Sequence, residues 1–497
     1  MKKYRSSLLQ RCHIKTLRLL FLGLMLLASE RAFGQVPGVL SLQEIQQYRT
    51  ERLERETRKA LEYLGRPSQR FLFDYGGWYR FSYLSFDDLN NDLTAKLKRV
   101  MRIHDIRLWA ALNLDNVQTF YVRQRTALND WDHNDNFRTG DTDLDFELDQ
   151  AFYSVQIDNA LRRYFEVKLP LRLQFTGGQF FSEVGTGLVY SRRGIGVELK
   201  GWSRFVNFTT FWSRTPPREN NIDFSVPGFR TEGQDRHFTG VVLSYPGFSH
   251  HEPYFFWVQQ KDHSEPVPPH PIQSKFDYDS YYFGLGLRGE LFIKNLNYEI
   301  EGIREIGRSY GDQVRFGGPQ SPNSISAWAV STRLTKIFDV LTRPRLDLRY
   351  ALATGDKDRL NPTNTVGGSA PGTTDRNFLH FGYIETGYML SPRLSNLQML
   401  RIGGSIKPLD FDLDLKDNLE VGVYYYLYKK DVAKGGISDF RANRPLNSLG
   451  QEFDAYINYK VLSDVFVNFN YGKFWPSGAF GEKTGREYFL ASLTFQF

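Results

Sequence analysis

Ten basic side chains share one face of segments in which apolar and polar residues alternate. They are Arg80, Arg123, Arg125, Lys168, Arg172, Arg288, Arg333, Arg345, Arg349 and Arg401. Guanidinium and ammonium groups that line a narrow passage favour anionic solutes. We therefore expect these ten residues to line a pore and to contact an anionic substrate.

Acidic residues share the same face, so the basic residues do not dominate it. They are Asp74, Asp145, Glu147, Asp149, Glu166, Glu290, Glu299, Glu301, Asp347, Glu420 and Asp454. Pairing across strands, for example of Arg123 and Arg125 with the acids at 145–149, would make the wall rigid. Selection of anions then depends on which arginines reach the constriction.

Two further motifs have a structural and a chemical interpretation. The GxGxxG pattern at Gly284–Gly289 lies within one alternating segment, whereas a dinucleotide site needs it between a strand and a helix. The pair His250 and His251, followed by Glu252, lies between prolines and is more typical of a turn than of a metal site. We therefore expect these glycines to leave space or to permit curvature of a strand.

The acids from Asp130 to Asp141 resemble a calcium loop only loosely, because Asp135 stands where such a loop needs glycine. A hydrated external loop is the expected structure, with weak divalent-cation binding as the alternative. No Ser/His/Asp arrangement has supporting context. The sequence thus predicts no enzyme, no cofactor and no metal.

The elements that position the basic residues have a period of two. In Tyr164–Phe175, Phe165 and every second residue after it are apolar, while Lys168 and Arg172 lie on the other face. Successive side chains of a strand point to opposite sides, so this segment is the clearest predicted strand. The pattern recurs at residues 71–83, 143–149, 280–291, 345–350 and 419–427.

A soluble β-sandwich and a membrane β-barrel both produce such alternation. Segments such as Tyr278–Leu291 are long for sandwich strands, and aromatic residues cluster at segment ends, as at Trp78–Tyr79 and Phe474–Trp475. Short connections such as Val461–Asp464 alternate with long ones such as Arg214–Arg236. These features favour an all-β, transmembrane antiparallel barrel, in which apolar residues face lipid and ionic residues face the lumen.

We count about 18 strands, with Gly194–Gly201 and Leu397–Lys407 as the least certain segments. An even number agrees with bacterial barrels. The last strand, Phe489–Phe497, ends in an aromatic residue and resembles the signal read by the outer-membrane assembly machinery. Barrels of this size leave an aqueous channel. We expect the long loops Thr215–Asp235 and Gly355–Asp375 to gate its outer mouth.

The chain of 497 residues begins with basic residues, the apolar stretch Leu19–Ala28 and small residues at Ala32 and Gly34. Residues 1–34 are therefore a predicted secretory signal, with a retained anchor as the alternative. Seven of the 63 basic and one of the 56 acidic residues lie there, so the remainder carries a net charge of +1. This balance gives no reason to expect nucleic-acid binding. The only cysteine, Cys12, also lies in the signal.

Residues 35–68 form a predicted periplasmic helical segment, and residues 69–497 the barrel. Leu40–Leu64 has a sparse apolar stripe and opposite charges at helical spacing, and Gly65 and Pro67 end it. This short amphipathic helix rests on the barrel mouth or serves as a spacer; the alternative is a plug or docking element.

Several short stretches, in their order and spacing, resemble the alginate export family of outer-membrane barrels. They are Asp149–Phe152, Leu171–Gly187, Ser391–Leu397, Gly450–Asp454 and Phe474–Phe480. The resemblance implies a monomeric 18-stranded barrel with an arginine-rich pore that passes an acidic exopolysaccharide outward without ATP, as the polymer leaves a periplasmic scaffold. The helix at 40–64 and the many inner-face acids depart from that pattern.

We expect a passive channel of the bacterial outer membrane that exports an anionic, alginate-like exopolysaccharide. The alternatives are a porin for uptake of small anionic solutes and a plugged structural or enzymatic barrel. Expected partners are the polysaccharide, the lipid bilayer with its lipopolysaccharide, the outer-membrane assembly machinery and periplasmic export proteins.

Overall fold

The computed structural model describes residues 71–87, 98–133, 135, 142–216, 235–248, 250–263, 278–311, 321–359, 368–409 and 418–497. The predicted signal at 1–34, the helix at 40–64 and the boundary at 69 lie outside these residues.

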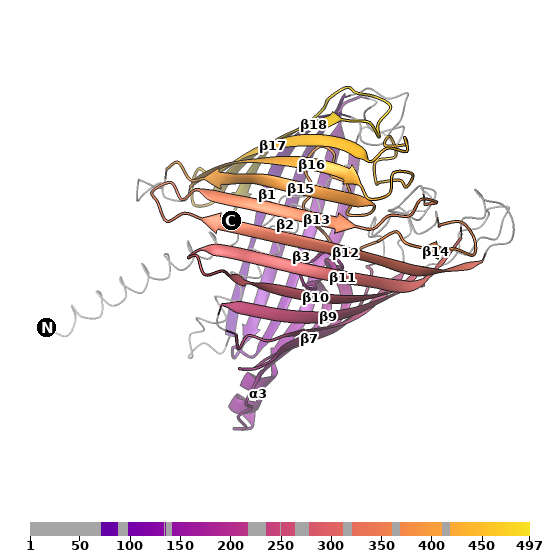
Figure 1. The fold of residues 1–497 in the computed structure, drawn as a ribbon. Helices are drawn as coiled ribbons and strands as arrows, with labels where there is room; N and C mark the ends of the chain where they lie inside the picture. Colours follow the sequence, from indigo (N-terminus) through magenta and orange to yellow (C-terminus); the bar gives the residue numbers. More distant parts are fainter. Residues whose placement is uncertain are drawn as a thin grey trace.

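Eighteen antiparallel strands close into a barrel, because β1 pairs with both β2 and β19 (Figure 1). In the first half of the chain the wall strands are β1 (Phe71–Asp87), β2 (Lys98–Leu114), β3 (Gln118–Trp131), β4 (Thr142–Gln156), β5 (Arg172–Glu183), β6 (Ser191–Trp202), β7 (Asn207–Arg214), β8 (Arg236–Ser244) and β9 (His251–Asp262). In the second half they are β10 (Asp279–Glu290), β11 (Leu296–Tyr310), β12 (Pro322–Ile337), β13 (Arg345–Ala353), β15 (Leu397–Ile406), β16 (Leu419–Lys430), β17 (Ser448–Lys460), β18 (Val465–Pro476) and β19 (Arg486–Gln496). The predicted fold and strand number are confirmed, and the two uncertain segments are β6 and β15.

A nineteenth strand, β14 (Thr374–Asp375), is not part of the wall, since it pairs in parallel with β12 while β13 pairs directly with β15.

The two faces of the wall have opposite chemistry. On β16, Val423 and Leu427 point outward and are 46% and 42% exposed, whereas Glu420, Tyr424 and Tyr426 are buried inside. This arrangement is the reverse of that in a water-soluble protein, where apolar side chains lie inside. It agrees with a barrel that has lipid outside and polar groups inside. The barrel is therefore a multi-pass protein of the outer membrane. Among the described residues, no helix is long and apolar enough to span a membrane.

The connections at the two ends of the barrel differ in length. At one end are short links such as residues 115–117, 203–206 and 461–464, while at the other are residues 215–235 and 354–396. Outer-membrane barrels have short periplasmic turns and long external loops. The end with the long connections therefore faces outward.

The strand predicted over Tyr164–Phe175 is wrong in its first part. Residues Ile157–Tyr164 form α3, and β5 begins only at Arg172. The backbone N–H groups of Phe165 and Val167 both bond to the Leu161 carbonyl, and Glu166 has a φ of +59°. A left-handed residue cannot continue a regular strand. Alternation in this periplasmic connection therefore reflects a helix end and not a wall strand.

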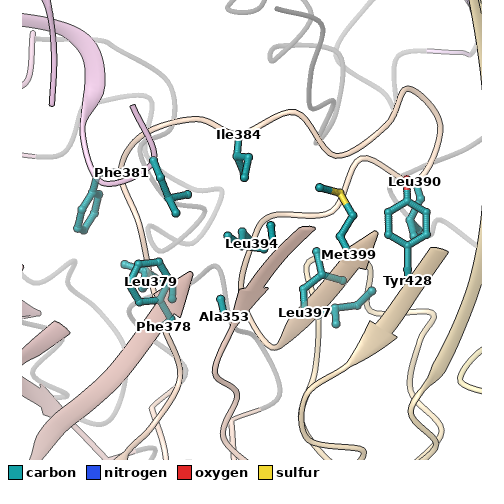
Figure 2. Packing of buried hydrophobic residues seen from close by; sticks show 14 of the residues in the cluster. Ala353, Phe378, Leu379, Phe381, Ile384, Leu390, Leu394, Leu397, Met399 and Tyr428 are labelled. Carbon is teal, nitrogen blue, oxygen red and sulfur yellow. The ribbon is translucent and has the colours of Figure 1, made fainter. Parts of the chain in front are cut away.

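Residues 376–396, which we call the lumen strap, fold back from the outer end into the barrel. Apolar strap residues, among them Phe378, Leu379 and Leu390, are buried against the inner face (Figure 2). They belong to one apolar cluster with Met399 and Tyr428 of the wall (Figure 2). The barrel thus has an apolar core inside its outer half, which the sequence did not predict.

Candidate functional site

Buried carboxyl groups of the wall hold the lumen strap by its backbone. Glu452 on β17 accepts hydrogen bonds from the N–H groups of Met389 and Leu390, at 2.6 and 2.9 Å. Asp454 accepts one from Tyr388 at 3.1 Å, and Glu305 on β11 accepts one from Leu379 at 2.9 Å. Each of these hydrogen bonds satisfies a backbone N–H group that is buried inside the barrel. These acids anchor a loop, and two of them, Glu305 and Glu452, were not among the predicted inner-face residues.

The strap meets the β5–β6 loop, residues 184–190, inside the barrel. Phe381, Gly382 and Tyr383 donate backbone hydrogen bonds of 2.8–3.1 Å to carbonyls of Val189, Leu188 and Gly187. A Cβ at position 382 would lie 2.0 Å from the Gly187 carbonyl oxygen, so only glycine fits there.

The β5–β6 loop is itself anchored, because Glu301 accepts hydrogen bonds from Thr186 N–H at 2.8 Å and Thr186 Oγ1 at 2.6 Å. β5 and β6 lie many strands away from β13 and β15 around the wall. The two loops therefore span the lumen between distant strands and constrict it.

Four arginines on three adjacent strands form what we call the arginine row. They are Arg333 on β12, Arg345 and Arg349 on β13, and Arg401 on β15. Arg333 is opposite Arg349 in the strand register, and Arg349 is opposite Arg401. Partners in register point to the same side of a sheet, so the register stacks three guanidinium groups side by side inside the barrel.

Two carboxylates face the arginine row. Asp347 lies 2.7 Å from Arg333 Nε and 3.6 Å from Arg345 Nη2, and it also pairs with Arg401. The second is Glu385 of the strap, which pairs with Arg401 and lies 3.9 Å from Arg349 Nη1. Glu299 on β11 is also opposite Arg333 in the register, so four arginines adjoin three acids. The row carries a surplus of positive charge in a largely buried place.

Tyrosine rings adjoin the arginine row on its β16 side. The Arg401 guanidinium lies 4.6 Å from the centre of the Tyr424 ring, and the Tyr424 and Tyr456 rings stack at 6.1 Å. Tyr426 and Tyr428 stack at 5.8 Å. Such rings offer flat apolar faces with a polar tip. Guanidinium groups beside aromatic faces are suited to a ligand that has both anionic and apolar surfaces.

A cavity of about 520 Å³ opens at the periplasmic end of the barrel, below the arginine row. Its lining includes Arg288, Arg333, Arg345, Glu299 and Tyr298. Two members of the row therefore border a space that a solute reaches from the periplasm, whereas the strap lies beyond them on the outer side.

Arg123 and Arg125 belong to a different cluster on β2, β3, β4 and β6. Arg123 Nε lies 2.5 Å from Asp149, and Arg125 pairs with Asp105, Asp145 and Glu147 at 2.9, 3.6 and 3.0 Å. The predicted pairing with the acids at 145–149 is confirmed. Arg107 and Arg193 also bind Asp149, so four described arginines face four acids. We call this balanced cluster the neutral network.

The other predicted site residues lie outside the arginine row, and Arg80 adjoins the neutral network, because it is opposite Asp105 in the strand register. Arg80 donates a hydrogen bond to Thr494 at 2.9 Å. Arg288 pairs with Glu252 at 2.8 Å at the periplasmic cavity. Lys168 and Arg172 are exposed at the periplasmic end beside α3 and do not join the arginine row.

Sequence reasoning missed four charged residues of these clusters. Asp105 and Arg107 follow the alternation of β2 and were detectable from their spacing, whereas Arg193 stands at the beginning of β6, beside glycines. Glu385 lies in an irregular segment with no periodicity, so no sequence signal marks it.

The acids around Asp130 bind protein donors. Asp130 and Asp132 pair with Arg102 at 3.2 and 2.8 Å, and Asp135 accepts a hydrogen bond from Val100 N–H at 2.9 Å. Within the described ranges, no group of three or more His, Cys, Asp or Glu residues could hold a metal ion.

The strap contains one histidine, His380, whose Nδ1–H donates a hydrogen bond to the Gly382 carbonyl at 3.1 Å. Burial, assisted by the Arg393 guanidinium, lowers the pKa of His380 to about 3. A buried imidazole stays neutral at physiological pH, so its protonation opposes the closed arrangement of the two loops.

Comparison with known proteins gives a family and a fold. A model of the family described as alginate export matches residues 71–489. No curated protein matches the chain.

Solved structures with the same fold share little sequence identity with this chain. Pseudomonas aeruginosa OccK2 (OpdF) in complex with glucuronate has a TM-score of 0.53 at 11% identity, with 86% of this chain and 99% of that chain covered. Pseudomonas aeruginosa OccK8 (OprE) has a TM-score of 0.52 at 11% identity, covering 86% and 98%. Acinetobacter baumannii OccAB4 has a TM-score of 0.50 at 10% identity, covering 87% and 100%.

Proposed function

The chain belongs to the alginate export family, and on that premise we propose that this outer-membrane channel exports an anionic, alginate-like exopolysaccharide from the periplasm. The observation that carries the proposal is the surplus positive charge of the arginine row. A polyuronate has one carboxylate on each sugar, and guanidinium groups bind carboxylates with two parallel hydrogen bonds. The tyrosines beside Arg401 supply faces against which sugar rings pack.

Glu385 stands where we expect a substrate carboxylate to bind. Its side chain comes from the strap, not from the wall, and pairs with Arg401 beside Arg349. A carboxylate that arrives through the periplasmic cavity competes with Glu385 for the same guanidinium groups. When a substrate carboxylate and Glu385 exchange on the same arginines, the net gain from each substrate contact is small. The substrate is therefore released again, as conduction requires.

The strap narrows this path on the outer side, so export of a polymer requires it to move. Its anchors are hydrogen bonds to wall carboxylates and one backbone pairing with the β5–β6 loop. A mobile element at a lumen constriction is consistent with a channel that conducts only when its substrate is present.

Uptake of small anionic solutes is the second candidate. The similar fold of OccK2, whose structure contains glucuronate, supports this alternative, because glucuronate is a single uronic acid. A strap that stays in place leaves room for small solutes only.

Proteoliposomes separate the two candidates. We expect a reversal potential that shows a preference for anions. We also expect uronate oligomers to cross the vesicle membrane when they are added on the side that the periplasmic end of the barrel faces. Arg349→Gln should reduce both, whereas Arg80→Gln, which changes an arginine outside the row, should reduce neither. Passage of glucuronate without oligomers would favour uptake. A cation-selective pore would contradict both candidates.

A further inference from the structure

A row of charged side chains crosses the outer surface of the barrel near its external end. In the strand register Arg214 on β7 is opposite His237 on β8, and His237 is opposite Lys261 on β9. Asp279 on β10 is opposite Arg308 on β11. Adjacent strands lie about 4.8 Å apart, so the row from Arg214 to Arg308 is about 19 Å long.

These side chains point outward, because their neighbours in sequence point into the barrel. Ser213, Gln260 and Ser280 are buried inside, whereas the Arg214 and Arg308 side chains are 51% and 57% exposed. The row therefore meets the membrane environment and has no part in the lumen.

The chemistry of this face changes with depth. Two residues below the row lie Trp212 and Tyr281, and below them Phe283 and Trp328, with apolar side chains further down. Aromatic belts mark the level of lipid headgroups. The charged row thus lies at the height of the outer-leaflet headgroups.

One further arginine reaches toward the row from within the belt. Arg304 on β11 is exposed beside Phe283 and donates a hydrogen bond to Ser326 at 2.5 Å, toward the external end. Long basic side chains near an interface reach in this way for the headgroup layer.

Positive charge exceeds negative charge on this face. Arg214 and Arg308 pair with Asp235 and Asp279, at 2.7 and 3.9 Å. Lys261 and Arg304 add two positive charges with no acidic partner among the described contacts. We call Arg214, Lys261, Arg304 and Arg308 the basic rim.

On two other faces of the outer rim, the basic residues near the external end are paired with acids. Arg102 on β2 pairs with two acids, Asp130 and Asp132. Lys473 on β18 pairs with Glu487 at 2.9 Å. The basic residues on β2 and β18 thus differ from Lys261 and Arg304, which have no acidic partner among the described contacts.

We propose that the basic rim binds the phosphorylated headgroup of a glycolipid of the outer leaflet. Phosphate oxygens accept hydrogen bonds from several guanidinium and ammonium groups at once. The acyl chains of the same molecule lie against the apolar band below the aromatic belt. The sheet thus presents donors and apolar surface in the order in which such a lipid presents phosphate and acyl chains.

The test uses the mature full-length protein in detergent and measures lipid adducts by native mass spectrometry. The probes are bisphosphorylated lipid A, monophosphorylated lipid A and phosphatidylethanolamine. Lys261→Gln with Arg308→Gln removes two charges of the basic rim. Arg102→Gln with Lys473→Gln is the matched control, since it removes two outward-facing charges near the external end of other strands.

We expect the rim variant to bind bisphosphorylated lipid A about a hundredfold more weakly, because each of the two lost charge-assisted contacts costs about a factor of ten. The control should bind as the unchanged protein does. The unchanged protein should bind monophosphorylated lipid A more weakly than bisphosphorylated lipid A. This comparison requires no mutation, so a folding defect cannot explain its result.

Equal loss in the control, equal binding of phosphatidylethanolamine, or full displacement by millimolar inorganic phosphate would overturn the proposal. Ion selectivity of the lumen is measured separately, so failure here leaves the proposed transport function untouched.

Discussion

Glu385→Gln is the most informative change, because it removes the strap carboxylate that occupies the arginine row. The surplus charge of the row rises by one, while the shape of the side chain is kept. Opposite charges 3.9 Å apart, as Glu385 and Arg349 are, attract by about 4 kcal/mol at an effective dielectric constant of 20 and by about 1 kcal/mol in bulk water.

A channel lumen lies between these limits, so the freed guanidinium groups should bind a competing carboxylate more tightly by at least about 1 kcal/mol. This corresponds to at least about a fivefold decrease in the dissociation constant of glucuronate. Loss of the Glu385 contacts also weakens the docking of the strap, so the open-channel conductance should rise.

The assay is block of single-channel current in planar bilayers by glucuronate added from the periplasmic side. Glu452→Gln is the matched control, because Glu452 anchors the strap at Met389 and Leu390 but does not pair with the arginine row. We expect Glu452→Gln to raise conductance without tightening glucuronate binding.

Two results would refute this reasoning. Unchanged glucuronate block in Glu385→Gln would show that this carboxylate does not compete with the substrate. The same tightening in both variants would show that strap movement, and not the charge of the row, controls binding.

Three further predictions follow from the same geometry. Arg123→Gln should leave ion selectivity unchanged and lower the free energy of unfolding in urea by about 2–3 kcal/mol, because Asp149 in the neutral network loses a buried ionic partner; altered reversal potentials would place Arg123 on the pathway. Gly382→Ala should raise conductance, since its Cβ cannot fit against the Gly187 carbonyl; an unchanged conductance would show that the strap is held without this pairing. Below pH 6.5, acid should favour the undocked strap through His380: the closed state keeps the pKa of His380 at about 3, so an undocked strap gains a proton that the docked one refuses, worth about 2 kcal/mol at pH 5. His380→Gln removes this contribution, so its conductance should rise less between pH 6.5 and pH 5 than that of the unchanged protein; identical pH profiles of the two proteins would show that His380 does not control docking.

The barrel itself could be predicted from the sequence, because alternation is a local property. A strand that separates lipid from water must place apolar side chains on one side and polar ones on the other, and this pattern is readable in segments such as 419–427. The prediction failed at Tyr164–Leu171, where a helix end and a left-handed Glu166 follow a similar alternation. Periodicity over few residues does not distinguish a short connection from a strand.

The candidate site was only half predictable. Ten basic residues were expected to line the pore, yet four form the arginine row, and Arg123 and Arg125 lie in the neutral network. Both sets alternate identically along their strands. What separates them is the number of acids that the register and the strap bring within reach, and this depends on residues far apart in the chain.

The sequence by itself determined which face of each strand is ionic and that the chain closes as a membrane barrel, since each strand must satisfy lipid and water separately. Only the tertiary structure decided that residues 376–396 enter the lumen and that Glu385 meets Arg401. Charges in a low-dielectric interior act over a few ångströms, and those distances exist only once the wall has closed.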